Sequence, residues 1–459
     1  MSEFLDYAVK KCIRLGVSQA EVFSTNDVDT SVVIEKKQVK IGQVTRDRGM
    51  GIRVLVKKED GASTGFSYVT DFSRKAIAEA AEKAVRTAKV KKADKDLKSF
   101  QEKAKIPRKA EMLDGKILKT DPSDLIKIAT SMLEESSMDS RVSTISGGVY
   151  SGVGEVSIVN SLGISATYKS TAFGGHMYVV AEQGGSVGVG WEGHSSSHYE
   201  SGKLVAAARE AASIAIKQLN PKPLSSGVYD IVVEQDGLAD LLMNTLVQQT
   251  RADLAQKNQS PLAGKVGSQV ASEMVTFFDD PTIPRSQGSK PFDTEGCPTK
   301  MRPIIEKGVF RTFLHNSYTA KKENVENTGN ASRYIMFGTR PEYALEPGIG
   351  PHNLVLKPDK GEKEDLIREV KNGILVKGFI GAHTSNVQSG DFSLALDSVF
   401  RIESGDLTYP VKQAMIGGNM PSILKQVRLV ASNSKEVTMG PRMTLNAPTI
   451  LIEKVTVST

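Results

Sequence analysis

Apolar residues recur with the period of an α-helix at four places in the first half of the chain. The predicted helices span about residues 2–15, 72–90, 123–135 and 202–218. The second and fourth helices share the same spacing of mostly small residues on one face. These residues are Ile77, Ala81, Ala84 and Ala88 in the second helix and Leu204, Ala208, Ala211 and Ala215 in the fourth. Small side chains allow close approach, so we expect both helices to pack tightly on a sheet.

Strands are predicted between these helices by runs in which apolar and polar residues alternate. Such runs lie at 52–57, 155–159, 164–169 and 176–181. The order helix, strands, helix therefore occurs twice, in units of about 1–90 and 120–220 with a Lys-rich linker at 91–112. We interpret residues 1–220 as an N-terminal α+β domain built from two diverged repeats.

A second domain is expected to begin near residues 220–223, where Asn and Pro interrupt the pattern. A strand at 229–233 precedes one helix at about 236–256. Beyond it, short apolar runs between Gly, Pro and Asn predict strands and turns, as at 304–310 and 373–380. Residues 221–459 should thus form a mostly β domain with a curved or barrel-like sheet, and the fold class of the chain is α+β.

Composition narrows the possible partners of this 459-residue chain. The net charge of +6 is a mild excess, and the linker interleaves acids with its lysines, so no nucleic acid is expected as a partner. No apolar run approaches the ~18 residues of a membrane span. Only Cys12 and Cys297 could form a disulfide, and the N-terminus does not resemble a signal peptide. These features predict a cytoplasmic protein that does not bind membranes.

The six histidines are the first candidates for a metal site. Only His194 and His198 are close together, with the spacing that binds zinc well on a helix. The residues between them are three serines after Gly193, which favour a loop or strand. On a strand their side chains would lie roughly 13 Å apart. We interpret them as polar histidines outside a metal site, with a zinc site as the alternative.

Other catalytic patterns are weaker. Ser393 follows His383 by ten residues, but the chain has no Gly-x-Ser-x-Gly nucleophile motif. The Gly-rich segment 184–190 lacks the Lys and the helix of a phosphate-binding loop, so its glycines indicate strands and a turn. Taken alone, the residues therefore describe a two-domain α+β protein without an evident catalytic set.

The second domain resembles the TldD/PmbA metallopeptidase family over nearly its whole length. The matching motifs stand in family order: Ser260-Pro261-Leu262-Ala263-Gly264-Lys265-Val266-Gly267, Asp279-Asp280-Pro281, Asp293-Thr294-Glu295-Gly296-Cys297-Pro298-Thr299, Ile305-Glu306-Lys307-Gly308-Val309, Thr328-Gly329-Asn330-Ala331-Ser332-Arg333, Gly390-Asp391-Phe392-Ser393, Tyr409-Pro410-Val411 and Ile416-Gly417-Gly418-Asn419-Met420. Each motif is weak alone, but the ordered set is specific. The duplicated first domain resembles the N-terminal half of the same family.

The family has two types of subunit, and the resemblance indicates the type of this chain. The TldD type carries His-Glu-x-x-x-His on the first helix of its C-terminal domain and is the peptidase. The TldE/PmbA type lacks these zinc ligands and pairs with TldD. In this sequence residues 236–249 contain neither His nor Glu, and no histidine stands between His198 and His315. The resemblance therefore implies a TldE/PmbA-type subunit without catalytic or metal-binding residues and without a cofactor of its own, with zinc in a TldD-type partner.

The resemblance also implies a function in the proteolysis of small or unfolded peptides, to which this subunit would contribute a peptide-binding chamber. The polar candidates for lining that channel are His315, Asn330, Arg333, His383, Asn386, Asp391 and Ser393. Those beside glycines could instead cap turns. The partner would be a TldD-type subunit in a heterodimer, or a second copy in a homodimer. Two alternatives remain, a self-sufficient zinc metallopeptidase and a non-enzymatic, chaperone-like peptide-binding module.

Overall fold

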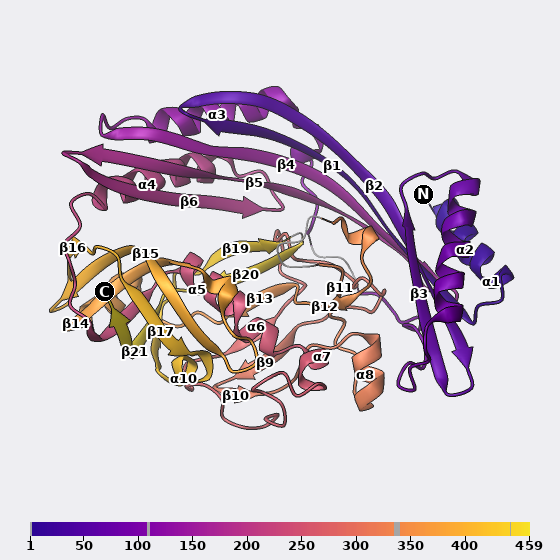
Figure 1. Ribbon diagram of the computed structural model, residues 1–459. Helices are drawn as coiled ribbons and strands as arrows, with labels where there is room; N and C mark the ends of the chain where they lie inside the picture. Colours follow the sequence, from indigo (N-terminus) through magenta and orange to yellow (C-terminus); the bar gives the residue numbers. More distant parts are fainter. Residues whose placement is uncertain (1, 108–110, 335–339, 441) are drawn as a thin grey trace.

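The computed structural model describes residues 2–107, 111–334, 340–440 and 442–459 (Figure 1). It confirms the α+β class, with a long curved sheet from the N-terminal half lying over a β-rich C-terminal half (Figure 1). No helix within the described residues is long and apolar enough to cross a membrane.

One antiparallel six-stranded sheet unites the two N-terminal repeats. Its strand order is β3–β2–β1–β4–β5–β6, so that β1 of the first repeat pairs with β4 of the second from Glu21–Asn160 to Glu35–Ser146. The strands are β1 Gln19–Glu35, β2 Gln38–Lys58, β3 Gly61–Val69, β4 Val142–Asn160, β5 Ser165–Gln183 and β6 Ser186–Ser196. The helices are α1 Ser2–Arg14, α2 Arg74–Val90, α3 Pro122–Ser136 and α4 Ser201–Lys217, with a 3-10 turn η1 at Ile117–Lys119.

These strands are much longer than the runs at 155–159, 164–169 and 176–181 that alternation predicts. The sequence from Ser146 to Gly154 is rich in Gly and Ser and gives no alternating signal, yet its backbone pairs with β5 throughout. Gly184 and Gly185 adopt positive φ in the β5–β6 hairpin, which confirms the interpretation of that segment as strands and a turn.

The two faces of the sheet have different neighbours. Along β1, Val22 packs in the core of α1 and α2, and Val32 packs in the core of α3 and α4. Glu21 and Phe23 alternate with them, and Phe23 shares a small core with Phe292 of the C-terminal half. All four helices therefore cover one face, and the C-terminal half covers part of the other.

The repeat is visible in the packing of its closing helices. A side chain at Gly65 of β3 would collide with the backbone of Ala84 and Ala88 in α2. A side chain at Gly190 of β6 would collide with the backbone of Ala211 and Ala215 in α4. The alanines that the sequence places at matching positions thus pack on a glycine in the edge strand of each unit, as their small size predicts.

The C-terminal half contains a closed barrel of five strands. The order β14–β7–β21–β17–β15 closes on itself because β14 also pairs with β15. The strands of this half are β7 Gly227–Val233, β8 Phe277–Asp279, β9 Arg302–Glu306, β10 Val309–Phe310, β11 Ala331–Ser332, β12 Gly348–Ile349, β13 Asn353–Leu356, β14 Asn372–Ile380, β15 Asp391–Glu403, β16 Asp406–Pro410, β17 Met415–Asn419, β18 Val427–Val430, β19 Lys435–Gly440, β20 Met443–Ala447 and β21 Ile450–Ser458. A second sheet has the order β10–β9–β8–β13–β20–β19, and β11 pairs with β12.

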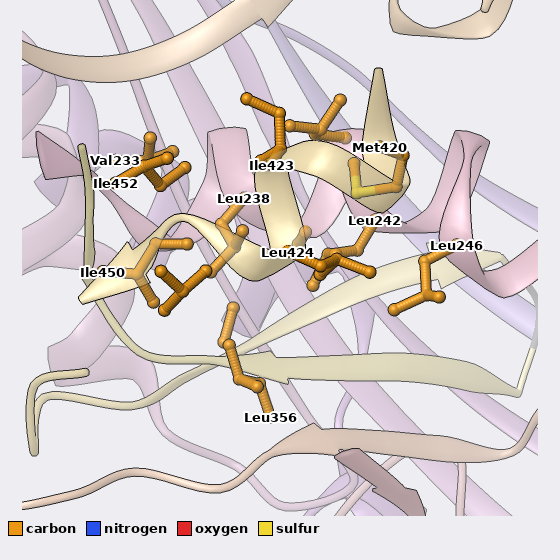
Figure 2. Packing of buried hydrophobic residues seen from close by; sticks show 14 of the residues in the cluster. Val233, Leu238, Leu242, Leu246, Leu356, Met420, Ile423, Leu424, Ile450 and Ile452 are labelled. Carbon is orange, nitrogen blue, oxygen red and sulfur yellow. The ribbon is translucent and has the colours of Figure 1, made fainter. Parts of the chain in front are cut away.

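The short helices of this half are α5 Gln235–Asn244, α6 Leu246–Gln249, α7 Ala252–Ala255, α8 Ser317–Glu323, α9 Lys363–Arg368 and α10 Met420–Lys425, with 3-10 turns η2 Glu342–Ala344 and η3 Ala382–Thr384. Helix α5 lies inside the main core, where Leu238, Leu242 and Leu246 pack at helical spacing beneath α10 (Figure 2). Their burial fixes α5 and the start of α6 between the two sheets.

The prediction of a single helix at 236–256 is wrong, because this segment is broken into the three helices α5, α6 and α7. Thr245 has the non-helical angles φ −125° and ψ −87°, and its hydroxyl donates to the carbonyl oxygen of Leu241. A threonine that bonds to the carbonyl four residues earlier competes with the backbone hydrogen bonds and bends a helix. The break changes which side chains of this segment face outward.

The glycine packing predicts a stability difference. Gly190→Ala should lower the free energy of unfolding by about 1–3 kcal/mol, because its Cβ would force α4 away from β6. Gly202→Ala in the first turn of α4 is the control, since a Cβ there meets nothing within 4 Å. It should change stability by no more than about 1 kcal/mol, in the stabilising direction. Urea unfolding of both variants measures this, and equal effects would contradict the packing account.

Candidate functional site

A cavity of about 500 Å³ lies against the broken helical segment α5–α7, and we call it the α5–α7 cavity. Its other walls come from the paired strands β11 and β12, the segment that leads into β12, and the start of β20. It is lined by Met243, Val247, Gln248, Arg251, Ser332, Tyr334, Leu345, Glu346, Gly348, Ile349, Gly350, Pro351 and Met443. The resemblance places the zinc ligands of a TldD-type subunit on the first helix of the C-terminal domain, which corresponds to this segment.

The floor of the α5–α7 cavity is apolar, and its one guanidinium group is already bonded. Met243, Val247 and Met443 are buried side chains. Arg251 donates to both carboxylate oxygens of Asp253 at 3.1 and 3.0 Å and to Gln248 Oε1 at 3.1 Å. The guanidinium is therefore held by its own neighbours on α6 and α7.

The donors on this helical face do not fit a zinc ion. Met243, Val247, Gln248 and Arg251 offer a thioether, an alkyl group, an amide and a cation, whereas protein zinc sites use thiolate, imidazole and carboxylate. Within the described ranges no three His, Cys, Asp or Glu side chains lie close enough to hold a metal ion. The expectation that zinc belongs to a partner subunit stays a prediction.

Two of the predicted channel residues, Arg333 and Asn330, lie behind the cavity wall. Arg333 donates to the carbonyl oxygen of Leu345, and Asn330 donates to that of Gly350 at 3.2 Å. Asn330 also donates to Asp279 at 2.7 Å and contacts His352 Nδ1 at 3.1 Å. These side chains are buried and bond to the backbone that lines the cavity, so they hold its wall in place.

His315 is buried one layer further away. Its carbonyl oxygen accepts hydrogen bonds from the backbone N–H of Asn330 and from the hydroxyl of Thr328. Its Nε2 lies 3.9 Å from Glu323, and its Nδ1 has no hydrogen-bond partner. Burial lowers the pKa of the imidazole, which favours the neutral ring.

Arg333 also belongs to a buried charge network of Glu21, Arg53, Glu295 and Arg333. Glu21 accepts from Arg333 at 2.8 Å and from Arg53 at 2.9 Å, and Arg53 reaches Glu295 at 2.7 Å. Glu295 in turn accepts from the backbone N–H of Ser317 at 2.8 Å, the first residue of α8. The network therefore ties strands β1 and β2 of the N-terminal sheet to the C-terminal segment behind the α5–α7 cavity.

The other four predicted residues do not line the α5–α7 cavity and lie where β14 is connected to β15. His383, Asn386, Asp391 and Ser393 are exposed, in or beside the loop between β14 and β15. Asn386 Oδ1 caps this loop by accepting from the backbone N–H of Gln388 and Ser389, and Asp391 accepts from Asn419 at 2.8 Å. Gln249 of α6 donates to the carbonyl oxygen of Val387 in the same loop, at 3.2 Å. The seven residues thus form two groups, one behind the α5–α7 cavity and one around the β14–β15 loop.

Sequence reasoning missed a second hollow region between the N-terminal sheet and β19. Three adjoining cavities of about 340, 140 and 270 Å³ all have Thr438 in their walls, while Tyr150 lines the first two and Trp191 the last two. Trp191 is 41% exposed, and the half-buried Arg442 pairs with Asp27. These residues come from strands distant in sequence, and Tyr150 and Trp191 carry no local motif that could have singled them out.

His194 and His198, the alternative zinc pair, have separate partners. His194 Nε2 contacts Glu200 at 2.7 Å, and His198 Nδ1 contacts Ser197 Oγ at 2.9 Å. His194 lies in strand β6, in agreement with the strand alternative that its serine-rich neighbourhood favours. Cys12 is buried in the helix core, and burial raises the pKa of its thiol to about 12, as expected of a small core residue.

Three family models together match most of the chain. The PmbA/TldA metallopeptidase C-terminal domain matches residues 226–459, the metallopeptidase domain 1 matches 20–88 and the metallopeptidase central domain matches 115–219. The C-terminal model alone covers about half of the sequence.

Relatives of both subunit types are similar over nearly their full length. An uncharacterized protein from Methanocaldococcus jannaschii is 28% identical, with 91% of this chain and 93% of the relative covered. A metalloprotease TldD homolog from Haemophilus influenzae is 27% identical, with 93% of this chain and 87% of the relative covered. A metalloprotease PmbA homolog from the same organism is 25% identical, with 100% of this chain and 96% of the relative covered. The crystal structure of TldE from Thermococcus kodakarensis shares the fold, with a TM-score of 0.88, 24% identity and 100% of each chain covered.

The buried charge network predicts a large effect from one isosteric change. Glu21→Gln should destabilise the chain by about 3–5 kcal/mol, because two guanidinium groups would lose their shared carboxylate inside the protein. The control is Glu3→Gln. Glu3 forms an ion pair with Arg74 in which both side chains are exposed, so its loss should cost no more than about 1 kcal/mol. Denaturant unfolding of both variants tests this, and similar values would rule out the network as a structural anchor.

Proposed function

We propose that this chain, which belongs to the PmbA/TldD metallopeptidase family, is a TldE/PmbA-type subunit that binds peptide and leaves zinc chemistry to a TldD-type partner. The observation that carries this proposal is the face of α5–α7. It borders a cavity large enough for part of a substrate, yet presents no group that zinc prefers. A subunit of this kind supplies substrate contacts and not the chemical step.

Two features support a role in holding unfolded peptide. The α5–α7 cavity and the cavities below the N-terminal sheet are open hollows of about 140–500 Å³, a size that admits side chains of an extended chain but not a folded protein. Strand β19 and strand β6 are edges of their sheets, and an extended peptide can bind such an edge through its backbone hydrogen bonds. We therefore expect small or unfolded peptides as substrates.

The seven predicted channel residues divide into two roles under this proposal. His383, Asn386, Asp391 and Ser393 are exposed and would contact peptide or the partner subunit directly. Asn330 and Arg333 would act indirectly, since they position the backbone that lines the α5–α7 cavity, and His315 would support them. Two buried, unpaired cysteines fit a reducing compartment, and we expect the complex to work in the cytoplasm.

The proposal predicts activity only from the pair of subunits. This chain alone should not hydrolyse casein or an unstructured peptide, whereas addition of a TldD-type partner should give hydrolysis that a zinc chelator abolishes. A partner in which both histidines of His-Glu-x-x-x-His are replaced by Ala is the control, and its mixture with this chain should be inactive. Peptide release measured by mass spectrometry reports the result.

Chelator-sensitive hydrolysis by this chain alone would contradict the proposal and favour a self-sufficient zinc peptidase. In that case loss of the bound zinc in His194→Ala and His198→Ala would locate the site. Peptide binding without hydrolysis in any pairing would favour a chaperone-like module instead. A homodimer that requires no TldD-type partner for activity would likewise contradict the assignment.

A further inference from the structure

We propose that the α5–α7 cavity is a pocket for a bulky apolar side chain, aliphatic or aromatic, of an extended peptide. The inference rests on the proposed function and adds a substrate preference to it. It follows from three properties of the cavity, which are its size, the bonding state of its polar groups and the kind of apolar residue in its walls.

The size of the pocket suits a large side chain with some of its neighbouring backbone. Its volume of about 500 Å³ falls in the range of roughly 300–1,000 Å³ that is usual for sites that enclose ligands. The cavity opens at β12, where Gly348 and Glu346 are exposed while Ile349 beside them is buried. Under this proposal a side chain enters beside the exposed Gly348 and packs against Ile349 and the buried floor.

The polar groups of the pocket do not call for a charged ligand. Arg251 is already bonded to Asp253 and Gln248, so its charge is compensated within the wall. Glu346 stands at the exposed mouth, where water screens its charge. A carboxylate or ammonium group on the floor would lose its hydration without gaining a partner, whereas an apolar group gains the free energy of burial.

Two methionines make the floor adaptable. Met243 comes from α5 and Met443 from β20, and they line the pocket together with Val247 and Ile349. Methionine is unbranched and polarisable, so methionine-rich surfaces accept ligands of different shapes and contact aromatic rings favourably. We therefore expect the pocket to accept both Leu and Phe side chains rather than to select one shape.

A peptide series on the full chain tests this proposal directly. Short unstructured peptides that differ only in one central residue, Leu, Phe, Ser or Asp, are labelled with a fluorophore and titrated with the protein. The Leu and Phe peptides should bind at least about tenfold more tightly than the Ser and Asp peptides. Equal binding across the series would overturn the proposal without the need for any variant.

A substitution at the mouth tests whether this cavity is responsible. Gly348→Phe should fill the entrance, and its Cβ would meet only the carbonyl oxygen of Ser332, at 3.6 Å, so the backbone need not move. Binding of the Leu and Phe peptides should fall by about tenfold, to the level of the Ser peptide. Gly348→Ala is the matched control and should retain the preference. Persistence of the full preference in Gly348→Phe would place the apolar contact elsewhere and overturn the assignment to this cavity.

The two proposals fail in different ways. If the mixture with a TldD-type partner hydrolyses peptide but the series shows no apolar preference, only the pocket is wrong. If the preference is present and Gly348→Phe removes it, but no pairing gives hydrolysis, the pocket stands and the proposed function is wrong.

Discussion

The arrangement of this protein depends on four charges that are buried together. Glu21, Arg53, Glu295 and Arg333 come from two strands of the N-terminal sheet and two loops of the C-terminal half. Transfer of any one of them from water into the protein interior would be costly alone, and only the complete set compensates the loss of hydration. Arg53 stacks on Phe100 and Arg333 on Phe23, which limits their rotamers further. These contacts link the N-terminal sheet to the C-terminal half at this point.

That docking sets the geometry of the functional region. Arg333 carries the network into the wall of the α5–α7 cavity through its bond to Leu345, and Asn330 fixes the same wall at Gly350. On the other side, the leucines of α5 are packed in the main core beneath α10. The break at Thr245 then leaves Val247, Gln248 and Arg251 facing a cavity. Rigid walls around an adaptable methionine floor are suited to binding a substrate that another subunit cleaves.

Local sequence signals were sufficient for much of this structure. Helical spacing located α1–α4, the matching alanines revealed the repeat, and Gly184-Gly185 identified a hairpin turn, because these features depend on neighbours in the chain. The pairing of β1 with β4, the barrel closure by β14 and β15, and the burial of Arg333 depend on contacts between distant residues, which no local period encodes. Arg333 was expected to line a channel, and only its partner Glu21, far away in sequence, explains its burial. The cavity walls were missed for the same reason.

The most direct measurement of the central claim is the zinc content of the purified chain and of its complex with a TldD-type partner, determined by elemental mass spectrometry. The account predicts far less than one zinc ion per molecule in this chain alone, and one zinc ion per heterodimer that is lost when the partner's histidines are replaced. A stoichiometric zinc ion bound by this chain alone, and retained through dialysis, would contradict it.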